Sequence, residues 1–165
     1  TREFVERAIR LKEVLTPYGV PLIINDRVDV ALAADADGVH VGQSDMPYEM
    51  VKRLLPEGKI IGLSVESPEQ VLEANNYDLD YVAASPVFST TTKTNTIVEW
   101  GLDGLRWIRS VSRHPLVAIG GIHSNNVASI CKAGADSVAV ISAIVSADDP
   151  ERAARELLEK SGEPH

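Results

Sequence analysis

The stretch that decides the fold reads ADADGVHV at residues 34–41, and it returns as AGADSVAV at residues 133–140. Both copies follow the pattern Ala-Asp-x-Val-x-Val, and LDYV at residues 79–82 is a weaker third copy. The return of one helix-to-strand turn along a chain indicates repeated βα units. Units of this kind build either a doubly wound sheet or a (β/α)₈ barrel.

Short, nearly continuous apolar runs alternate with amphipathic segments along the chain. The runs lie at residues 20–24, 38–41, 59–64, 80–84, 116–119 and 137–141, as expected for parallel strands that are covered on both faces. Apolar residues at helical spacing occupy residues 4–15, 47–55, 68–75, 104–111 and 125–132. The alternation predicts an α/β fold.

Two turns favour the barrel over the doubly wound sheet. IGGI at residues 119–122 is rich in glycine, and VISAI at residues 140–144 carries small residues. The loops after the last two strands of a TIM (β/α)₈ barrel commonly hold a phosphate on backbone N–H groups. Because about six strands are legible and such a barrel has eight, we expect the first two βα units to be missing. Residues 1–165 would then form a single, N-terminally incomplete barrel domain.

Composition limits the classes of function. The chain has 165 residues and a formal net charge of -8, which argues against binding nucleic acid through a basic face. No apolar run approaches the roughly 20 residues that a membrane span needs. The first residues lack the apolar centre of a signal peptide, and a lone Cys131 forms no internal disulfide, so a cytoplasmic protein is expected. Whether it is a homo-oligomer is left open.

Polar residues stand where the predicted strands end. Asn25 and Asp26 follow one apolar run, and Asp45 follows the next. The carboxyl ends of barrel strands form the active face, where these side chains would converge. Two carboxylates with an adjacent amide make an oxygen site suited to Mg²⁺, which completes its shell with water and substrate phosphate. The alternative is that Asn25-Asp26 only caps the following helix.

The same face would carry groups for a second anion. Lys93, beside Thr90, Thr91 and Thr92, supplies a positive charge and hydroxyl donors, and Gly121 with Ser142 offers another anion pocket. A metal-diphosphate site beside a monophosphate site indicates a reaction that joins two phosphorylated molecules. In the alternative interpretation Lys93 is an exposed lysine and residues 120–121 form only a tight turn. His40 is interpreted as an interior histidine with satisfied hydrogen bonds.

Seven segments, in order along the chain, carry a resemblance to a known family. They are YGVPLIINDRVDVALA (18–33), ADGVHVGQSD (36–45), GLSV (62–65), PVF (86–88), TTTK (90–93), AIGGI (118–122) and AVISAI (139–144). With these segments the sequence resembles the thiamine-phosphate synthase family. That family also has a Gln-x-Arg-x-Lys motif on its second strand, which would fall before Thr1, so the diphosphate clamp is expected to be incomplete.

The resemblance implies a Mg²⁺-dependent transferase acting on small phosphorylated substrates. It would join an aminopyrimidine methyl diphosphate to a thiazole phosphate, or its carboxylated form, and release pyrophosphate. The implied roles are catalysis for Lys93 and Ser64, diphosphate-substrate binding for Asn25, Ser64 and Lys93, metal binding for Asp26 and Asp45, and thiazole-phosphate binding for Thr90, Thr91, Thr92, Gly121, Ile141 and Ser142. Two alternatives stay open: a thiazole tautomerase-like isomerase, and a non-catalytic barrel that binds thiazole or thiamine phosphate.

Overall fold

The computed structural model describes residues 1–88 and 99–162, which form two compact units. Unit 1 comprises Thr1–Ser64 and Tyr77–Tyr81. Unit 2 comprises Val65–Asn76 and Val82–His165. Within these units the described strands pair in parallel, and helices follow them in the chain, as the sequence predicts.

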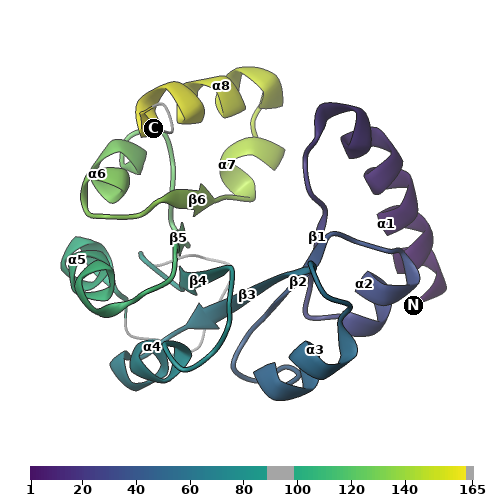
Figure 1. Cartoon of the computed structure of the whole chain (residues 1–165). Helices are drawn as coiled ribbons and strands as arrows, with labels where there is room; N and C mark the ends of the chain where they lie inside the picture. The colour runs from purple at the N-terminus through teal and green to yellow at the C-terminus, as the bar shows by residue number, and fades with distance from the viewer. Residues whose placement is uncertain (89–98, 163–165) are drawn as a thin grey trace. The chain divides into compact units, whose positions relative to one another are not determined.

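Unit 1 is built on three strands, with β2 pairing to β1 and to β3. Its elements are α1 (Arg2–Leu15), the 3₁₀ turn η1 (Thr16–Tyr18), β1 (Ile23–Asn25), α2 (Val28–Ala33), β2 (Gly38–Val41), α3 (Tyr48–Leu54) and β3 (Ile60–Val65). In Figure 1, α2 lies against both α1 and β1. The buried side chains of Ile24, Val39 and Ile61 form its core between strands and helices. Burying such side chains is what stabilises a parallel sheet.

Unit 2 repeats the plan with β5 between β4 and β6. Its elements are α4 (Pro68–Ala74), β4 (Tyr81–Ala84, whose first residue belongs to unit 1), α5 (Gly101–Val111), β5 (Leu116–Ile119), α6 (Val127–Lys132), β6 (Ser137–Ala139), α7 (Ser142–Val145) and α8 (Pro150–Ser161). Figure 1 shows α5 between α4 and α6, and α8 beside α6 and α7. Leu105, Ile108 and Ile130 are fully buried under this layer.

The repeated turn has the same structural role in each of its copies. In every copy the aspartate that precedes a strand accepts a hydrogen bond from a backbone N–H near the start of the preceding strand. The pairs are Asp37 with Leu22, Asp80 with Ile61, and Asp136 with Leu116, each at 2.7 Å.

The structure contains three helices that the apolar pattern did not indicate, α2, α7 and α8. In α1 the periodicity predicts the helix correctly, but of its apolar series only Ala8 is buried, while Phe4 is 40% and Leu11 47% exposed. Helical spacing reports which residues share a face and says nothing about what covers that face.

Across the part of the chain that is described, no helix is both long and apolar enough to cross a membrane.

Candidate active site

The chain turns sharply at the carboxyl end of β1. Asn25 ends the strand, and Asp26 has a φ of 63°. The Asp26 N–H donates a 2.8 Å hydrogen bond to the His40 carbonyl of β2, and Asp26 Oδ1 accepts one of 2.7 Å from Asn25 Nδ2. Aspartate adopts a left-handed backbone more readily than most non-glycine residues, and such conformations are concentrated at functional sites. This conformation is consistent with Asp26 as a site residue, and that role stays a prediction.

The alternative interpretation of Asn25-Asp26 as a helix cap is wrong. Arg27 is the N-cap residue of α2, and no side chain makes a capping hydrogen bond there. Asp29, in the first turn of α2, binds Arg27 through hydrogen bonds of 2.8 and 2.6 Å. This pairing with the guanidinium lowers the pKa of Asp29 to about 2.

Asp45 lies in the loop that follows β2. Its Oδ2 accepts a 2.7 Å hydrogen bond from the Gly42 N–H, and its own N–H donates one of 3.2 Å to the Gly42 carbonyl. A Cβ on Gly42 would lie 3.0 Å from that Oδ2, tighter than about nine in ten real Cβ contacts, so glycine gives the carboxylate room to approach the backbone. Since β1 and β2 are paired, the two predicted metal ligands follow neighbouring strands of unit 1.

Ser64, near the end of β3, is held at both its side chain and its backbone. Ser64 Oγ lies 2.9 Å from His40 Nε2, and its carbonyl accepts a 2.6 Å hydrogen bond from Gln43 Nε2. The other ring nitrogen of His40 lies 3.0 Å from the Tyr81 hydroxyl. The predicted hydrogen bonds of His40 are confirmed, although the residue is half-buried and not fully interior. One of its partners, however, is a predicted site residue.

His40 is thus a neighbour of the site that the sequence patterns did not assign to it, whereas Gln43 belongs to the predicted strand-end group that also includes Asp45. His40 lies opposite Gly62 in the register of β2 and β3, so Ser64, two residues further along, is on the same face of the sheet. This shared face is the signal that could have identified His40. Using it requires the register of β2 against β3, which the apolar pattern of a strand buried on both faces does not specify.

The two predicted metal ligands, Asp26 and Asp45, are both carboxylates. Groups of three or more His, Cys, Asp or Glu residues able to hold a metal do not occur within residues 1–88 and 99–162. Zn²⁺ and Ca²⁺ sites usually need more protein ligands, whereas Mg²⁺ is held by one or two carboxylates together with water and substrate phosphates. Asp26 and Asp45 are of the residue type that Mg²⁺ sites use, and the metal itself stays a prediction.

In unit 2 the predicted phosphate-binding residues follow β5 and β6. Gly120 and Gly121 have φ of 98° and 65°, and a Cβ on Gly120 would lie 2.8 Å from Pro86 Cβ. The Gly121 carbonyl accepts a 2.9 Å hydrogen bond from Asn126 Nδ2, which holds the turn. The turn itself therefore favours glycine at both positions, which agrees with the alternative interpretation of residues 120–121 as a tight turn. Phosphate binding at Gly121 stays a prediction.

Ile141 and Ser142 lie where β6 gives way to the short helix α7. Both side chains are exposed, and Ile141 is 71% exposed. The remaining predicted residues, Thr90, Thr91, Thr92 and Lys93, lie outside the described residues. Their roles in substrate binding and catalysis stay predictions.

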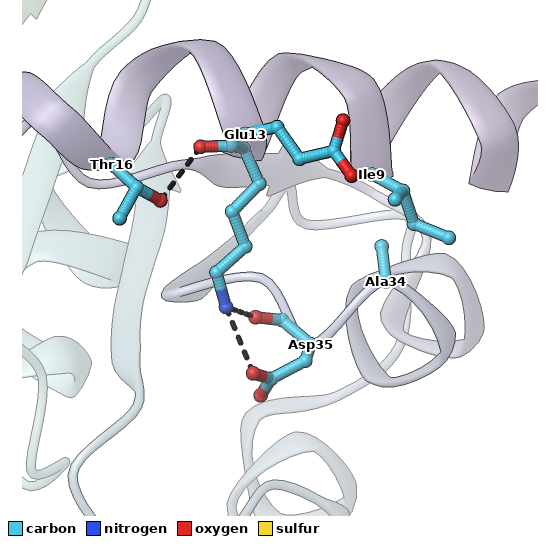
Figure 2. A pocket seen from close by; sticks show the side chains of 6 residues that line it. Ile9, Glu13, Thr16, Ala34 and Asp35 are labelled. Atoms are coloured by element: carbon cyan, nitrogen blue, oxygen red, sulfur yellow. Dashed lines mark hydrogen bonds and ion pairs between the residues drawn. The ribbon is translucent and has the colours of Figure 1, made fainter.

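A surface depression against α1 lies elsewhere in unit 1. It is lined by Ile9, Lys12, Glu13, Thr16, Ala34 and Asp35, and Figure 2 shows Asp35 facing the helix. Asp35 comes before β2, at the opposite end of the strand from Gly42 and Asp45. Its carboxylate already binds Lys12 and Lys59 at 2.9 and 2.6 Å. The depression therefore lies at the other end of β2 from Asp45, and Asp35 in it forms two ion pairs.

Residues 1–144 match the family described as thiamine monophosphate synthase. The chain belongs to the thiamine monophosphate synthase family. The thiamine-phosphate synthase of Albidiferax ferrireducens is 52% identical over 157 residues, which cover 95% of this chain and 72% of that protein. The thiamine-phosphate synthase of Vibrio parahaemolyticus is 50% identical over 157 residues, covering 95% of this chain and 77% of that protein.

A solved structure has the same fold. The thiamine phosphate pyrophosphorylase of Pyrococcus furiosus superposes with a TM-score of 0.90 at 42% identity, over 97% of this chain and 76% of that one. Membership in the thiamine monophosphate synthase family confirms the resemblance found in the sequence, and with it the prediction of a transferase enzyme. The individual roles of the site residues stay predictions.

Proposed function

We propose that this chain provides the active site of a thiamine-phosphate synthase, which joins an aminopyrimidine methyl diphosphate to a thiazole phosphate, or its carboxylated form, and releases pyrophosphate. The observation that carries the proposal is the turn after β1. There Asp26 has a left-handed backbone and is held by the Asn25 amide and the His40 carbonyl. An acidic residue with a left-handed backbone, and a second carboxylate after the neighbouring strand, fit a metal-assisted phosphate site.

Unit 1 would bind the diphosphate substrate. Asn25 and Ser64 contact the aminopyrimidine diphosphate, while Asp26 and Asp45 hold Mg²⁺. When bound, Mg²⁺ supplies positive charge that stabilises the departing pyrophosphate. The Asn25 amide orients the Asp26 carboxylate by their 2.7 Å hydrogen bond.

The reaction needs no strong base or nucleophile from the protein. The bond between the pyrimidine methylene carbon and the diphosphate oxygen breaks, and pyrophosphate leaves with the electron pair. The thiazole nitrogen then donates its lone pair to the resulting carbocation and forms the new carbon–nitrogen bond. Lys93 would stabilise the charge that develops on the leaving group, which is the main way such a site lowers the barrier.

Unit 2 would bind the thiazole phosphate. Gly121, Ile141 and Ser142 act largely through backbone groups, and Thr90, Thr91 and Thr92 add hydroxyl donors. Backbone N–H groups in glycine-rich turns are suited to phosphate oxygens. Exposure of Ile141 and Ser142 keeps this region accessible to a ligand.

We further propose that the enzyme is one closed (β/α)₈ barrel domain to which the six described strands belong. Two parallel three-strand ladders and the coverage of 76% of the Pyrococcus furiosus chain support this arrangement. A cytoplasmic location fits a chain with a single cysteine, Cys131. The net charge of -8 argues against nucleic acid as a partner.

The deciding experiment measures pyrophosphate release with aminopyrimidine methyl diphosphate and thiazole phosphate, first with Mg²⁺ and then with a chelator. Release that requires both substrates and the metal is the expected result. Isomerisation of the thiazole phosphate without the pyrimidine would instead favour the tautomerase-like enzyme. Binding of thiazole phosphate without any turnover would favour the non-catalytic barrel.

A further inference from the structure

His40 of β2 contacts two hydroxyl groups at once. Nε2 lies 2.9 Å from Ser64 Oγ, and Nδ1 lies 3.0 Å from the Tyr81 hydroxyl oxygen. The imidazole also stacks on the Tyr81 ring, with centroids 5.5 Å apart and planes 15° from parallel. The ring is therefore held at both nitrogen-bearing edges and on one face.

Gly62 makes room for this arrangement. It lies opposite His40 in the register of β2 and β3. A Cβ there would collide with the Tyr81 ring and lie 2.6 Å from His40 Nδ1, closer than real Cβ contacts. Any side chain at position 62 would force Tyr81 and His40 apart. The side chains of His40 and Tyr81 therefore fill the space above Gly62.

Ser64 is constrained from two directions by residues of β2 and the loop after it. His40 contacts its hydroxyl at 2.9 Å, and Gln43 donates a 2.6 Å hydrogen bond to its carbonyl. Two such contacts limit both the backbone and the rotamer of the serine. A substrate contact held in this way is preorganised, which lowers the cost of ordering it on binding.

Building on the proposed function, we infer that His40 is a positioning residue for Ser64: with Tyr81 behind it, the imidazole fixes the Ser64 hydroxyl for contact with the aminopyrimidine diphosphate. His40 itself does not need to touch the substrate. Its backbone carbonyl also accepts the Asp26 N–H at 2.8 Å, so one residue of β2 supports both Ser64 and the Asp26 turn.

The chemistry of imidazole explains why Tyr81 matters to Ser64. A neutral imidazole has one N–H and one lone pair, so the two hydroxyls that contact it must take opposite roles, one donating and one accepting. Burial, with a smaller contribution from the charge of Asp80, raises the pKa of Tyr81, so its hydroxyl keeps its proton at neutral pH. The direction of the Ser64 hydrogen bond is therefore coupled to Tyr81 through His40.

The test uses the full-length enzyme and two substitutions that separate the two ring nitrogens. His40→Asn keeps a polar atom near the Nδ1 position and cannot reach Ser64, whereas His40→Gln places one near the Nε2 position. Loss of one such hydrogen bond corresponds to about a tenfold effect. We expect His40→Asn and Ser64→Ala each to raise the KM for the aminopyrimidine diphosphate by about that factor, with the KM for thiazole phosphate unchanged.

Two controls distinguish positioning from a general structural role. Because His40 would act through Ser64, the double variant His40→Asn with Ser64→Ala should be no worse than either single variant, and His40→Gln should recover most of the loss. His114 is a matched histidine in unit 2, 5% exposed and 2.9 Å from the Ala74 carbonyl. His114→Asn should lower the melting temperature without raising the KM for the aminopyrimidine diphosphate relative to the KM for thiazole phosphate.

Three outcomes would overturn the inference: an unchanged KM in His40→Asn, effects of His40→Asn and Ser64→Ala that multiply, or a loss with His40→Gln equal to that with His40→Asn. A wild-type enzyme that releases no pyrophosphate would instead overturn the proposed function. Calorimetric binding of the aminopyrimidine diphosphate would then decide the role of His40. Binding about tenfold weaker in His40→Asn supports it, and equal or absent binding overturns it.

Discussion

Asp136 binds Leu116 through two hydrogen bonds that join the starts of β5 and β6. Its Oδ2 accepts one of 2.7 Å from the Leu116 N–H, and its own N–H donates one of 2.8 Å to the Leu116 carbonyl. Asp80 makes the same pair of hydrogen bonds with Ile61. The repeated aspartate therefore holds the amino ends of neighbouring strands together, and we assign it a role in stability rather than in chemistry.

Replacing Asp136 should lower stability without affecting catalysis. Asp136→Ala leaves the N–H of the fully buried Leu116 without its acceptor, at a cost of about 1–3 kcal/mol in the free energy of unfolding. Urea denaturation measures the change. Asp136→Asn keeps an oxygen acceptor and should lose less.

Arg109 provides the control for the charge of Asp136, since the two form a 3.1 Å ion pair on an exposed surface. Arg109→Met removes that pair and keeps the apolar stem, so it should cost less than about 1 kcal/mol. Equal losses in Arg109→Met and Asp136→Ala would show that the ion pair, and not the backbone hydrogen bond, matters.

Substitutions of Asp26 should separate activity from stability. Asp26→Gly removes the carboxylate and relaxes the backbone, whose φ is 63°. We expect Mg²⁺-dependent pyrophosphate release to fall by at least about a hundredfold, as when a charge-stabilising group is removed. The melting temperature should stay the same or rise, because glycine adopts this conformation without strain.

Asp26→Ala serves as the comparison. It should be equally inactive with little unfolding, and less stable than Asp26→Gly by roughly 1–2 kcal/mol, the cost of a left-handed backbone for an L side chain. Unchanged activity in either variant would refute the assignment of Asp26 to the metal.

Ser142 is expected to act through its backbone. Ser142→Ala should therefore change the KM for thiazole phosphate by less than about threefold, which corresponds to under 1 kcal/mol. Ser142→Asp adds a negative charge to an exposed position and should raise that KM by more than about tenfold through repulsion of the phosphate. A large rise in Ser142→Ala would mean that the hydroxyl itself binds the substrate.

Asp35 should make stability depend on pH in the acid range. Hydrogen bonds from Lys59 and Lys12, together with their charges, lower the pKa of Asp35 from 3.8 to about 2. Because the folded state favours the ionised carboxylate, its contribution is complete above the unfolded pKa of about 4 and is lost as pH falls toward 2.

Asp35→Asn is the matched variant, since asparagine also tolerates the φ of 48° at this position. The difference in melting temperature between the wild type and Asp35→Asn should be constant from pH 5 to 7 and shrink below pH 4. A difference that does not change over this range would show that the two lysines contribute nothing through the charge of Asp35.

Much of the architecture was predictable because apolar spacing reports burial. The βα alternation and the strand-end positions of Asn25, Asp26 and Asp45 follow from that spacing, and the structure confirms them. The pattern missed α2 and α8. In α8 the mean hydropathy is low and only Leu157 is buried, so its apolar signal is weak, and α2 has only six residues.

The sequence by itself determined the βα repeat, the family to which the chain belongs and the residue types available for a Mg²⁺-diphosphate site, since these depend on local spacing and on motifs. Only the tertiary structure decided that Asp26 has a left-handed backbone, that His40 and Gln43 contact Ser64, and that Tyr81 contacts His40. The physical reason is register. A hydrogen bond between side chains on different strands exists only once the strands are paired at one offset, and no property of either strand alone specifies that offset.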